Sequence, residues 1–275
     1  MYTSHFYTVS EDCRLHYLQI GNGSRLVLAF HGYGNTADMF RFLQHPDYTV
    51  LSFDLPYHGH SDWANQLPLD KETLRQMVLQ LMQAWQVNQV SLVGYSMGGR
   101  VCLVLCELMA ERVDKVVLLA PDGLRFNYFY YFLTRTRLGR LLFADFSRRS
   151  HAYQRLLSWI GALRLVSKSK YKFARSQVRS PEAVRLLNNT WNSTNQLIPD
   201  MKRVHQQLQQ HPLPVHILVG CYDKIIPARL AEAFRNACGT AEVQVHVVPR
   251  GHLLHEHPEV QAEACKWLFN PTAKA

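Results

Sequence analysis

The sequence lacks long hydrophobic runs. No uninterrupted apolar stretch approaches the roughly 18–20 residues that a membrane-spanning helix needs. Residues 1–6 contain neither the basic segment nor the apolar segment of a secretory signal. We therefore expect neither a transmembrane helix nor an export signal.

Cysteines are few and follow no recognisable pattern. The six cysteines are scattered along 275 residues without the spacing of a metal site or a disulfide scaffold. Cys102 and Cys106 lie four positions apart in an apolar segment, where we expect buried thiols on a helix. The simplest interpretation is a protein of the reducing cytoplasm.

The charged residues are unevenly distributed. The whole chain carries a formal net charge of +9. Residues 124–211 hold 16 lysines and arginines against three acidic residues, so this segment carries +13 and the remainder −4. Its apolar residues have helical spacing and no strand pattern. We therefore predict a helical cap over residues 123–211, inserted between two parts of one core, residues 1–122 and 212–275.

A basic helical surface has two interpretations. It is either an ordinary solvated face or a surface that attracts anionic substrates or acidic lipids. No nucleic-acid-binding module is recognisable, so we expect no nucleic-acid partner. The expected partner is a small molecule, and peripheral membrane contact through the basic cap is left open.

Short apolar runs alternate with amphipathic segments in the rest of the chain. Such alternation is typical of parallel β-α units and predicts an α/β fold with a doubly wound, mostly parallel sheet. Residues 6–9 and 14–18 predict an antiparallel hairpin that precedes it. The predicted strands are residues 26–30, 49–54, 90–93, 115–120, 215–220 and 242–248, and the predicted helices are residues 38–43, 71–85, 100–108, 228–237 and 258–269.

A serine lies between two glycines at one predicted strand-to-helix junction. Residues 93–99 read V-G-Y-S-M-G-G, with Ser96 at the centre of a G-x-S-x-G pattern. So sharp a turn strains the serine backbone, and its neighbours must be glycines to avoid the adjoining strand and helix. The serine hydroxyl is then exposed close to the N–H groups that begin the helix. This arrangement is typical of a catalytic nucleophile.

Further motifs follow other predicted strands. The residues H-G-Y-G at 31–34 follow the strand at 26–30, and their glycines allow backbone N–H groups to approach an anionic ligand closely. The residues G-C-Y-D end at Asp223 after the penultimate strand. A G-H pair ends at His252 after the final strand.

In this order, the motifs resemble those of the α/β-hydrolase fold superfamily, and the resemblance covers essentially the whole chain. It implies that Ser96 is the nucleophile, Asp223 the acid and His252 the base, in the family's order Ser, Asp, His. It also implies that the backbone N–H groups of Tyr33 and Met97 form the oxyanion hole. Such chemistry requires neither a metal nor an organic cofactor.

Other titratable residues compete for these roles. Asp122 follows a strand and is an alternative acid, because some relatives place the acid there. His58 and His60 lie in D-L-P-Y-H-G-H-S, which resembles another family loop and gives them a structural role. His255 and His257 follow the predicted base closely, but no carboxylate or cysteine spacing completes a metal site, so none is expected.

The residues beside these motifs are candidates for substrate contact. They are His31, Gly32, Tyr95 and Arg100. Arg100 also completes G-Y-S-M-G-G-R, which resembles the elbow of the menaquinone-pathway lyase that eliminates pyruvate from an anionic intermediate. An arginine at this position also has a simpler interpretation, a salt bridge on the helix.

The implied reaction is hydrolysis of a carboxylic ester or thioester through an acyl-enzyme on Ser96. Serine at the elbow argues against haloalkane dehalogenase and epoxide hydrolase chemistry, which use a carboxylate nucleophile. A carbon–carbon bond hydrolase or the lyase would use the same three residues, and both act on anionic substrates. The non-enzymatic alternative is a ligand-binding protein on this fold, as in hormone receptors that retain a pocket.

Overall fold

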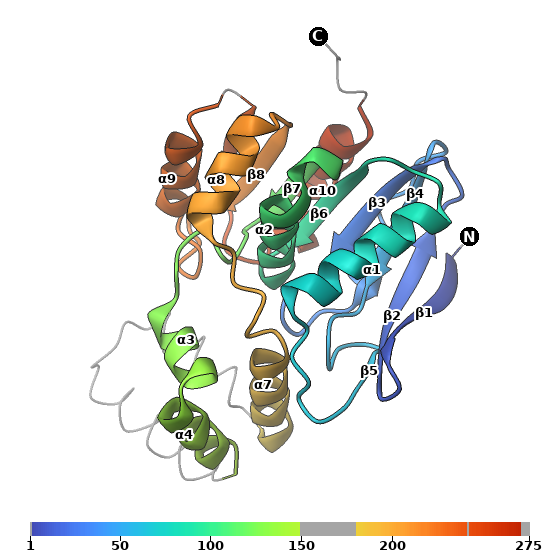
Figure 1. The fold of residues 1–275 in the computed structure, drawn as a ribbon. Coiled ribbons are helices and arrows are strands. Elements are labelled where there is room, and N and C mark those ends of the chain that lie inside the picture. Colours follow the sequence, from blue (N-terminus) through green and yellow to red (C-terminus); the bar gives the residue numbers. More distant parts are fainter. Residues whose placement is uncertain (1, 149–179, 241, 271–275) are drawn as a thin grey trace. The chain divides into compact units, whose positions relative to one another are not determined.

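The computed structural model describes residues 2–148, 180–240 and 242–270. The chain divides into two compact units (Figure 1). The first, the sheet unit, comprises Met1–Ala64, Asp70–Phe126 and Leu197–Ala275. The second, the helical unit, comprises Asn65–Leu69 and Asn127–Gln196.

The sheet unit is built on one mixed, mostly parallel sheet. Its strands are β1 (Tyr2–Ser10), β2 (Cys13–Ile20), β3 (Arg25–Phe30), β4 (Tyr48–Phe53), β5 (Asp62–Trp63), β6 (Val90–Tyr95), β7 (Val113–Leu119), β8 (Val215–Gly220) and β9 (Val243–Val248). They run in the order β1-β2-β4-β3-β6-β7-β8-β9, and β5 pairs with β2 outside this path. From β4 to β9 neighbouring strands are parallel, whereas β1 and β2 pair in antiparallel fashion.

Helices cover this sheet. They are α1 (Lys71–Ala84), α2 (Met97–Met109), α8 (Met201–Gln210), α9 (Ala228–Cys238) and α10 (Pro258–Phe269), with 3-10 turns η1 (Ala37–Phe40), η2 (Ala110–Arg112) and η3 (Leu254–Glu256). The Asp70 carboxylate begins α1 by accepting the Thr73 N–H at 2.7 Å. The predicted apolar face of this helix is buried at Leu74, Met77, Val78, Leu81 and Met82.

Successive residues of a strand point to opposite faces of the sheet, and both faces are buried. Val27 and Ala29 of β3 share a core cluster with Ala264 and Leu268 of α10. Leu28, which lies between Val27 and Ala29 in β3, is equally buried but lies outside that cluster, on the face where α2 contacts β3. Figure 1 shows α1 and α2 in front of the strands.

The predicted α/β fold with a mostly parallel sheet is therefore confirmed. The clearest local difference is the segment 38–43, which was expected to be a short helix. The structure has the 3-10 turn η1 at Ala37–Phe40 instead, and the Met39 N–H donates to Thr36 O at 3.1 Å in an i→i+3 bond. Such tighter turns are common in short connecting pieces.

The described part of the helical unit contains α3 (Tyr128–Arg135), α4 (Arg137–Arg148) and α7 (Pro181–Ser193). The Ser180 side chain caps α7 by accepting the Ala183 N–H at 3.2 Å. Residues 65–69 join this unit, and the Leu69 N–H donates to Ser193 O at 2.7 Å. Residues 149–179 of the predicted cap lie outside the described part of the chain.

The boundaries of the units differ from the predicted range 123–211. The helical unit ends at Gln196, and α8 belongs to the sheet unit. Val204 and Leu208 form the buried side of α8, which packs against α2 and α9. Charge and helical spacing did not reveal this, because they describe a helix without saying what its apolar side contacts. Among the described residues, no helix is long and apolar enough to cross a membrane.

Candidate active site

Ser96 occupies a strained turn between β6 and α2. Its φ of 49° and ψ of −111° are unusual for a residue with a side chain. The flanking glycines permit the turn, since a Cβ on Gly94 would lie 2.5 Å from the Gly98 carbonyl oxygen. A Cβ on Gly98 would lie 1.8 Å from the Phe30 carbonyl oxygen. The G-x-S-x-G pattern thus follows from close backbone packing around the serine.

Two loops far along the chain bring a histidine and an aspartate to this serine. His252 Nε2 lies 3.1 Å from Ser96 Oγ, and His252 Nδ1 lies 2.7 Å from Asp223 Oδ2. The three residues follow β6, β8 and β9, which are parallel and therefore end at the same edge of the sheet. The loops after β8 and β9 are joined directly, because the Tyr222 N–H donates to Arg250 O at 3.0 Å.

Asp223 is positioned to hold the histidine in one tautomer. Its side chain is fully buried, whereas that of His252 is 16% exposed. Asp223 Oδ1 accepts the N–H groups of Ile225 and Ile226 at 2.8 and 2.9 Å, which leaves Oδ2 to accept the proton on His252 Nδ1. His252 Nε2 then presents its lone pair to Ser96, as a general base must.

Asp122, the alternative acid, makes different contacts. Its Oδ2 lies 3.7 Å from Arg100 Nη1, and its Oδ1 accepts the Gly123 N–H at 2.8 Å. Its backbone N–H donates to Ser96 O at 2.9 Å. The geometry therefore favours Asp223 as the carboxylate that orients His252.

The candidate oxyanion donors lie in two segments that follow the neighbouring parallel strands β6 and β3. Met97 is the first residue of α2, where backbone N–H groups have no acceptor within the helix. Tyr33 lies in the loop between β3 and η1, one residue after Gly32. A Cβ on Gly32 would lie 2.6 Å from the Tyr95 ring, so glycine allows this loop to approach the end of β6.

Two buried histidines support that loop through neutral ring nitrogens. The Gly34 N–H donates to His58 Nε2 at 3.0 Å, and the Leu55 N–H donates to His31 Nε2 at 2.9 Å. Each histidine donates from Nδ1 to a carbonyl, His31 to Gly32 O and His58 to Pro56 O. Burial lowers the pKa of His31 to about 3 and also lowers the pKa of His58, so both stay neutral acceptors near pH 7.

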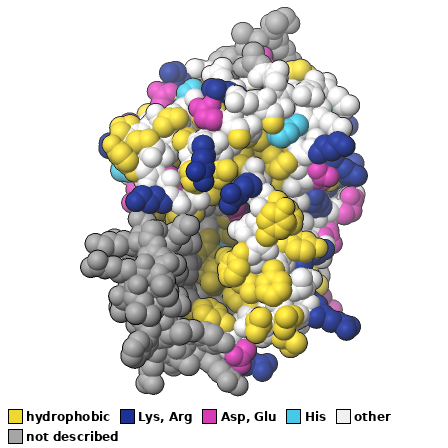
Figure 2. All heavy atoms as spheres, turned by 90° about the vertical axis from the view of Figure 1, so that its left-hand side faces the viewer, with side chains coloured by type: hydrophobic (Ala, Val, Ile, Leu, Met, Phe, Trp, Pro, Cys, Tyr) yellow, Lys and Arg dark blue, Asp and Glu magenta, His cyan; other side chains and the backbone are white. Residues whose placement is uncertain are grey.

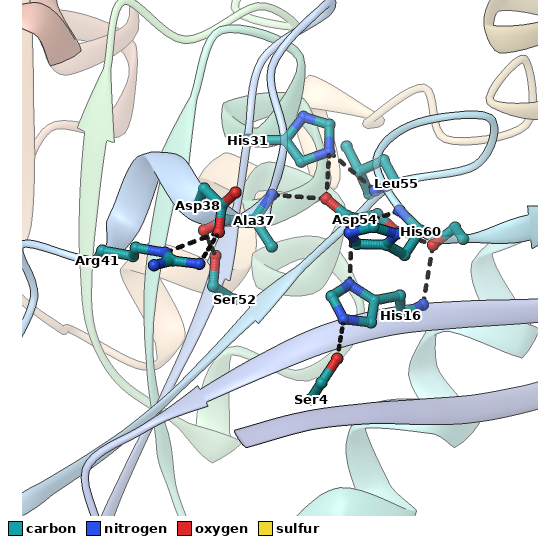
Figure 3. A network of polar contacts seen from close by, with 11 residues as sticks. Ser4, His16, His31, Ala37, Asp38, Arg41, Ser52, Asp54, Leu55 and His60 are labelled. Atoms are coloured by element: carbon teal, nitrogen blue, oxygen red, sulfur yellow. Dashed lines mark hydrogen bonds and ion pairs between the residues drawn. The ribbon is translucent and has the colours of Figure 1, made fainter. Parts of the chain in front are cut away.

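A buried carboxylate, Asp54, joins the same loop to β2 (Figure 3). Asp54 Oδ1 accepts the Ala37 N–H at 2.6 Å, and Oδ2 accepts the His60 N–H at 2.9 Å and the His16 Nδ1 proton at 2.7 Å. A Cβ on Gly59 would lie 2.0 Å from Oδ2, so the turn that follows β4 requires glycine there. The sequence analysis did not predict this network, because only His60 of the three partners lies beside Asp54 in D-L-P-Y-H-G-H-S, whereas His16 and Ala37 lie in distant segments.

The Asp54 network contains a second serine–histidine–aspartate series. Ser4 Oγ lies 2.5 Å from His16 Nε2, on the other side of the ring from Asp54. Ser4, however, lies within the regular strand β1, which pairs with β2. It has neither the strained turn nor the helix N-terminus that adjoins Ser96. We interpret this series as a support that fixes β1 and β2 to the loop after β4.

Three of the residues predicted to contact substrate have buried side chains. His31 is fully buried, Tyr95 is 2% exposed and Arg100 is 6% exposed. The Tyr95 hydroxyl donates to His252 O at 3.2 Å, and the Arg100 guanidinium faces Asp122. Gly32 is also buried. The polar groups of His31, Tyr95 and Arg100 contact other parts of the chain, and substrate contact by these residues stays a prediction.

In the described part of the chain, no group of three His, Cys, Asp or Glu side chains is placed to hold a metal ion. His255 Nε2 lies 3.3 Å from Asn35 Nδ2, and the His255 ring lies 4.4 Å from the Tyr95 ring. Cys102 and Cys106 are buried thiols, as predicted, and burial raises the pKa of Cys106 to about 12. A thiol with so high a pKa is a poor metal ligand or nucleophile.

Curated relatives match the chain at low identity. The "Dihydrolipoyllysine-residue acetyltransferase component of acetoin cleaving system" of Cupriavidus necator is 35% identical over 119 residues, which cover 41% of this chain and 31% of that protein. This alignment thus spans about a third of the relative's length. The "2-succinyl-6-hydroxy-2,4-cyclohexadiene-1-carboxylate synthase" of Enterobacter sp. is 26% identical over 233 residues, covering 81% of each chain.

Solved structures share the fold over nearly the whole chain. A thermophilic esterase from Thermogutta terrifontis, solved with malate bound, has a TM-score of 0.66 at 18% identity and covers 98% of both chains. The model of the family described as "alpha/beta hydrolase fold" matches residues 25–257, a range that contains Ser96, Asp223 and His252. This chain therefore belongs to the alpha/beta hydrolase fold family.

Proposed function

We propose that the protein is a serine hydrolase that cleaves a carboxylic ester or thioester of a small molecule through an acyl-enzyme on Ser96. The observation that carries the proposal is the hydrogen-bonded series from Ser96 Oγ through His252 to Asp223, with distances of 3.1 and 2.7 Å. A nucleophile, a base and a group that orients the base are the components of acyl transfer.

The reaction follows from these contacts. His252 Nε2 takes the Ser96 hydroxyl proton as Oγ attacks the acyl carbon, and the carbonyl oxygen becomes an oxyanion. The N–H groups of Tyr33 and Met97 bind that oxyanion, an effect worth about 3–4 kcal/mol per donor in other hydrolases. The imidazolium then protonates the leaving alcohol or thiol. Water, deprotonated by His252, releases the acyl group and restores Ser96.

Asp223 contributes without exchanging a proton. Its buried carboxylate stabilises the imidazolium that forms during each half-reaction, and it prevents the ring from turning. The loop that carries Tyr33 is supported beforehand by His31 and His58, so its N–H need not be reorganised as negative charge develops.

A second candidate is cleavage of a carbon–carbon bond, either by hydrolysis or by the lyase reaction that the 81% alignment with the Enterobacter synthase suggests. The G-Y-S-M-G-G-R sequence that ends at Arg100 also favours carbon–carbon bond cleavage. In the structure its guanidinium faces Asp122 at 3.7 Å, which offsets the positive charge available to an anionic substrate. We therefore rank ester or thioester hydrolysis first.

The test combines a fluorophosphonate label with a series of p-nitrophenyl esters from acetate to palmitate. We expect the label on Ser96, turnover with a chain-length optimum, and loss of both in Ser96→Ala. Ser4→Ala is the matched control, because Ser4 also contacts a histidine but lies outside the proposed site. This control should keep normal labelling and turnover.

The other outcomes separate the alternatives. A labelled Ser96 with negligible turnover of every ester would favour the carbon–carbon candidate. Absence of labelling in the wild type would support a ligand-binding protein and contradict the proposed hydrolase. Labelling that persists in Ser96→Ala but disappears in Ser4→Ala would move the nucleophile to β1.

A further inference from the structure

One side of α3 and α4 is anchored within the helical unit. The buried positions of the two helices are Tyr130, Thr134, Gly139 and Phe143. The Tyr130 hydroxyl donates to Trp191 O of α7 at 3.1 Å, and the rings of Tyr130 and Phe143 lie 5.1 and 5.5 Å from the Trp191 ring. These contacts determine which residues point away from α7.

A tight corner fixes the two helices to each other. The Thr136 hydroxyl accepts the Gly139 N–H at 3.0 Å and donates to Phe132 O at 2.9 Å. A Cβ on Gly139 would lie 1.9 Å from that carbonyl oxygen, so the close approach of α4 to α3 requires glycine. The outward residues of α3 and α4 therefore belong to one continuous surface.

This outward surface is apolar to an unusual degree. Tyr128 is 80% exposed, Phe129 65%, Leu138 60%, Leu141 69% and Leu142 47%. A surface helix normally places polar residues opposite its buried side. Figure 2 shows hydrophobic side chains gathered at the surface of the molecule. Exposed apolar clusters on this scale are typical of interaction sites.

The same surface is basic. Exposed arginines accompany the apolar residues, and Asp145 is the one acidic residue in the two helices; these arginines are Arg135, Arg137, Arg140 and Arg148. We call the exposed apolar and basic residues of α3 and α4 the docking face. They lie in the segment 124–211 that carries a net charge of +13.

We propose that the docking face binds the surface of an anionic lipid bilayer. Leucine and aromatic side chains enter the boundary between headgroups and acyl chains, and arginines bind lipid phosphates. A second copy of this chain is a poorer partner for the same face, because it would bring two sets of arginines together. Neither α3, with 8 residues, nor α4, with 12, is long enough to span a bilayer, so the contact is peripheral.

The test measures flotation of the protein with vesicles of phosphatidylcholine alone or with one quarter phosphatidylglycerol, at about 0.1 M salt. The charge variant is R137Q/R140Q/R148Q, and the apolar variant is L138S/L141S/L142S. The charge control is R112Q/K202Q/R229Q, which removes three exposed charges from the sheet unit. All substituted residues are exposed, and circular dichroism and thermal unfolding verify that each variant folds.

We expect binding to the anionic vesicles and little binding to phosphatidylcholine alone. Each arginine near an anionic surface strengthens partitioning about fivefold, so the charge variant should bind about 100-fold more weakly. The apolar variant should bind at least about tenfold more weakly, and the charge control should bind like the wild type.

Three results would overturn the proposal. The first is absence of wild-type binding to anionic vesicles, and the second is equal weakening by the charge variant and its control. The third is a lipid-free wild type that self-associates in sedimentation velocity while the apolar variant stays monomeric, which would assign the face to a second copy. Flotation requires no catalysis, so it can be repeated in Ser96→Ala, and its outcome is independent of the proposed hydrolase activity.

Discussion

Asp223→Asn exchanges one oxygen for an NH2 group, yet we expect it to remove the general base. Asp223 Oδ1 accepts two backbone N–H groups, from Ile225 at 2.8 Å and Ile226 at 2.9 Å. An asparagine keeps both bonds only if its amide oxygen takes that position. Its NH2 group then faces His252 Nδ1, which must become an acceptor. The ring proton consequently moves to Nε2 and points at Ser96 Oγ.

The size of the effect follows from this change of tautomer. A histidine that presents an N–H to the serine cannot take its proton, and the equivalent change lowers kcat about 10⁴-fold in a well-studied serine protease. The two backbone bonds survive, so we expect the free energy of unfolding to fall by only about 1–2 kcal/mol. The variant should therefore fold and bind substrate while turning it over very slowly.

The assay is steady-state hydrolysis of the best p-nitrophenyl ester, with thermal unfolding measured on the same samples. Asp122→Asn is the matched control, because Asp122 lies after β7 and faces Arg100 at 3.7 Å. We expect it to keep kcat within about tenfold of the wild type. A nearly normal rate in Asp223→Asn together with an inactive, folded Asp122→Asn would refute the reasoning.

Three further predictions concern the support of the site. Gly98→Ala places a Cβ 1.8 Å from the Phe30 carbonyl oxygen, so we expect unfolding free energy to fall by about 3 kcal/mol or more, measured by urea denaturation against Gly251→Ala, whose Cβ would meet no atom within 4 Å. His58→Leu removes the acceptor of a loop N–H and should lower kcat about 10–100-fold with little change in KM, whereas His58→Gln should recover part of the rate. Because burial lowers the pKa of His31 to about 3, the unfolded chain binds this proton first as the pH falls below about 6.5. The free energy of unfolding should then fall by about 1.4 kcal/mol per pH unit through this group. Measured by urea denaturation between pH 7 and 5, the unfolding free energy should depend less steeply on pH in His31→Asn than in the wild type.

The sequence alone determined the features that depend on near neighbours in the chain. The apolar runs predicted the strands, because both faces of a parallel sheet are buried. The glycines around Ser96 predicted its turn, and the backbone of α2 at Gly94 and of β3 at Gly98 leaves no room for a Cβ. The periodic apolar residues of α1 and α10 predicted which side of each helix is buried.

Only the tertiary structure decided which distant polar groups meet. His252 lies 156 positions from Ser96 along the chain. Their contact depends on the strand order β6-β7-β8-β9, which brings the loops after β6, β8 and β9 to one edge of the sheet. Asp122 and Asp223 both follow strands, and the choice between them rested on which loop reaches His252 Nδ1.

The same reason explains what the sequence could not reveal. A buried polar group needs a partner, but its type does not say whether that partner is a substrate or the chain itself. His31, Tyr95 and Arg100 bond or face other parts of the protein, and Asp54 gathers donors from three separate segments. Residue type and spacing predicted the chemistry of the site, whereas packing between distant segments decided which residues support it.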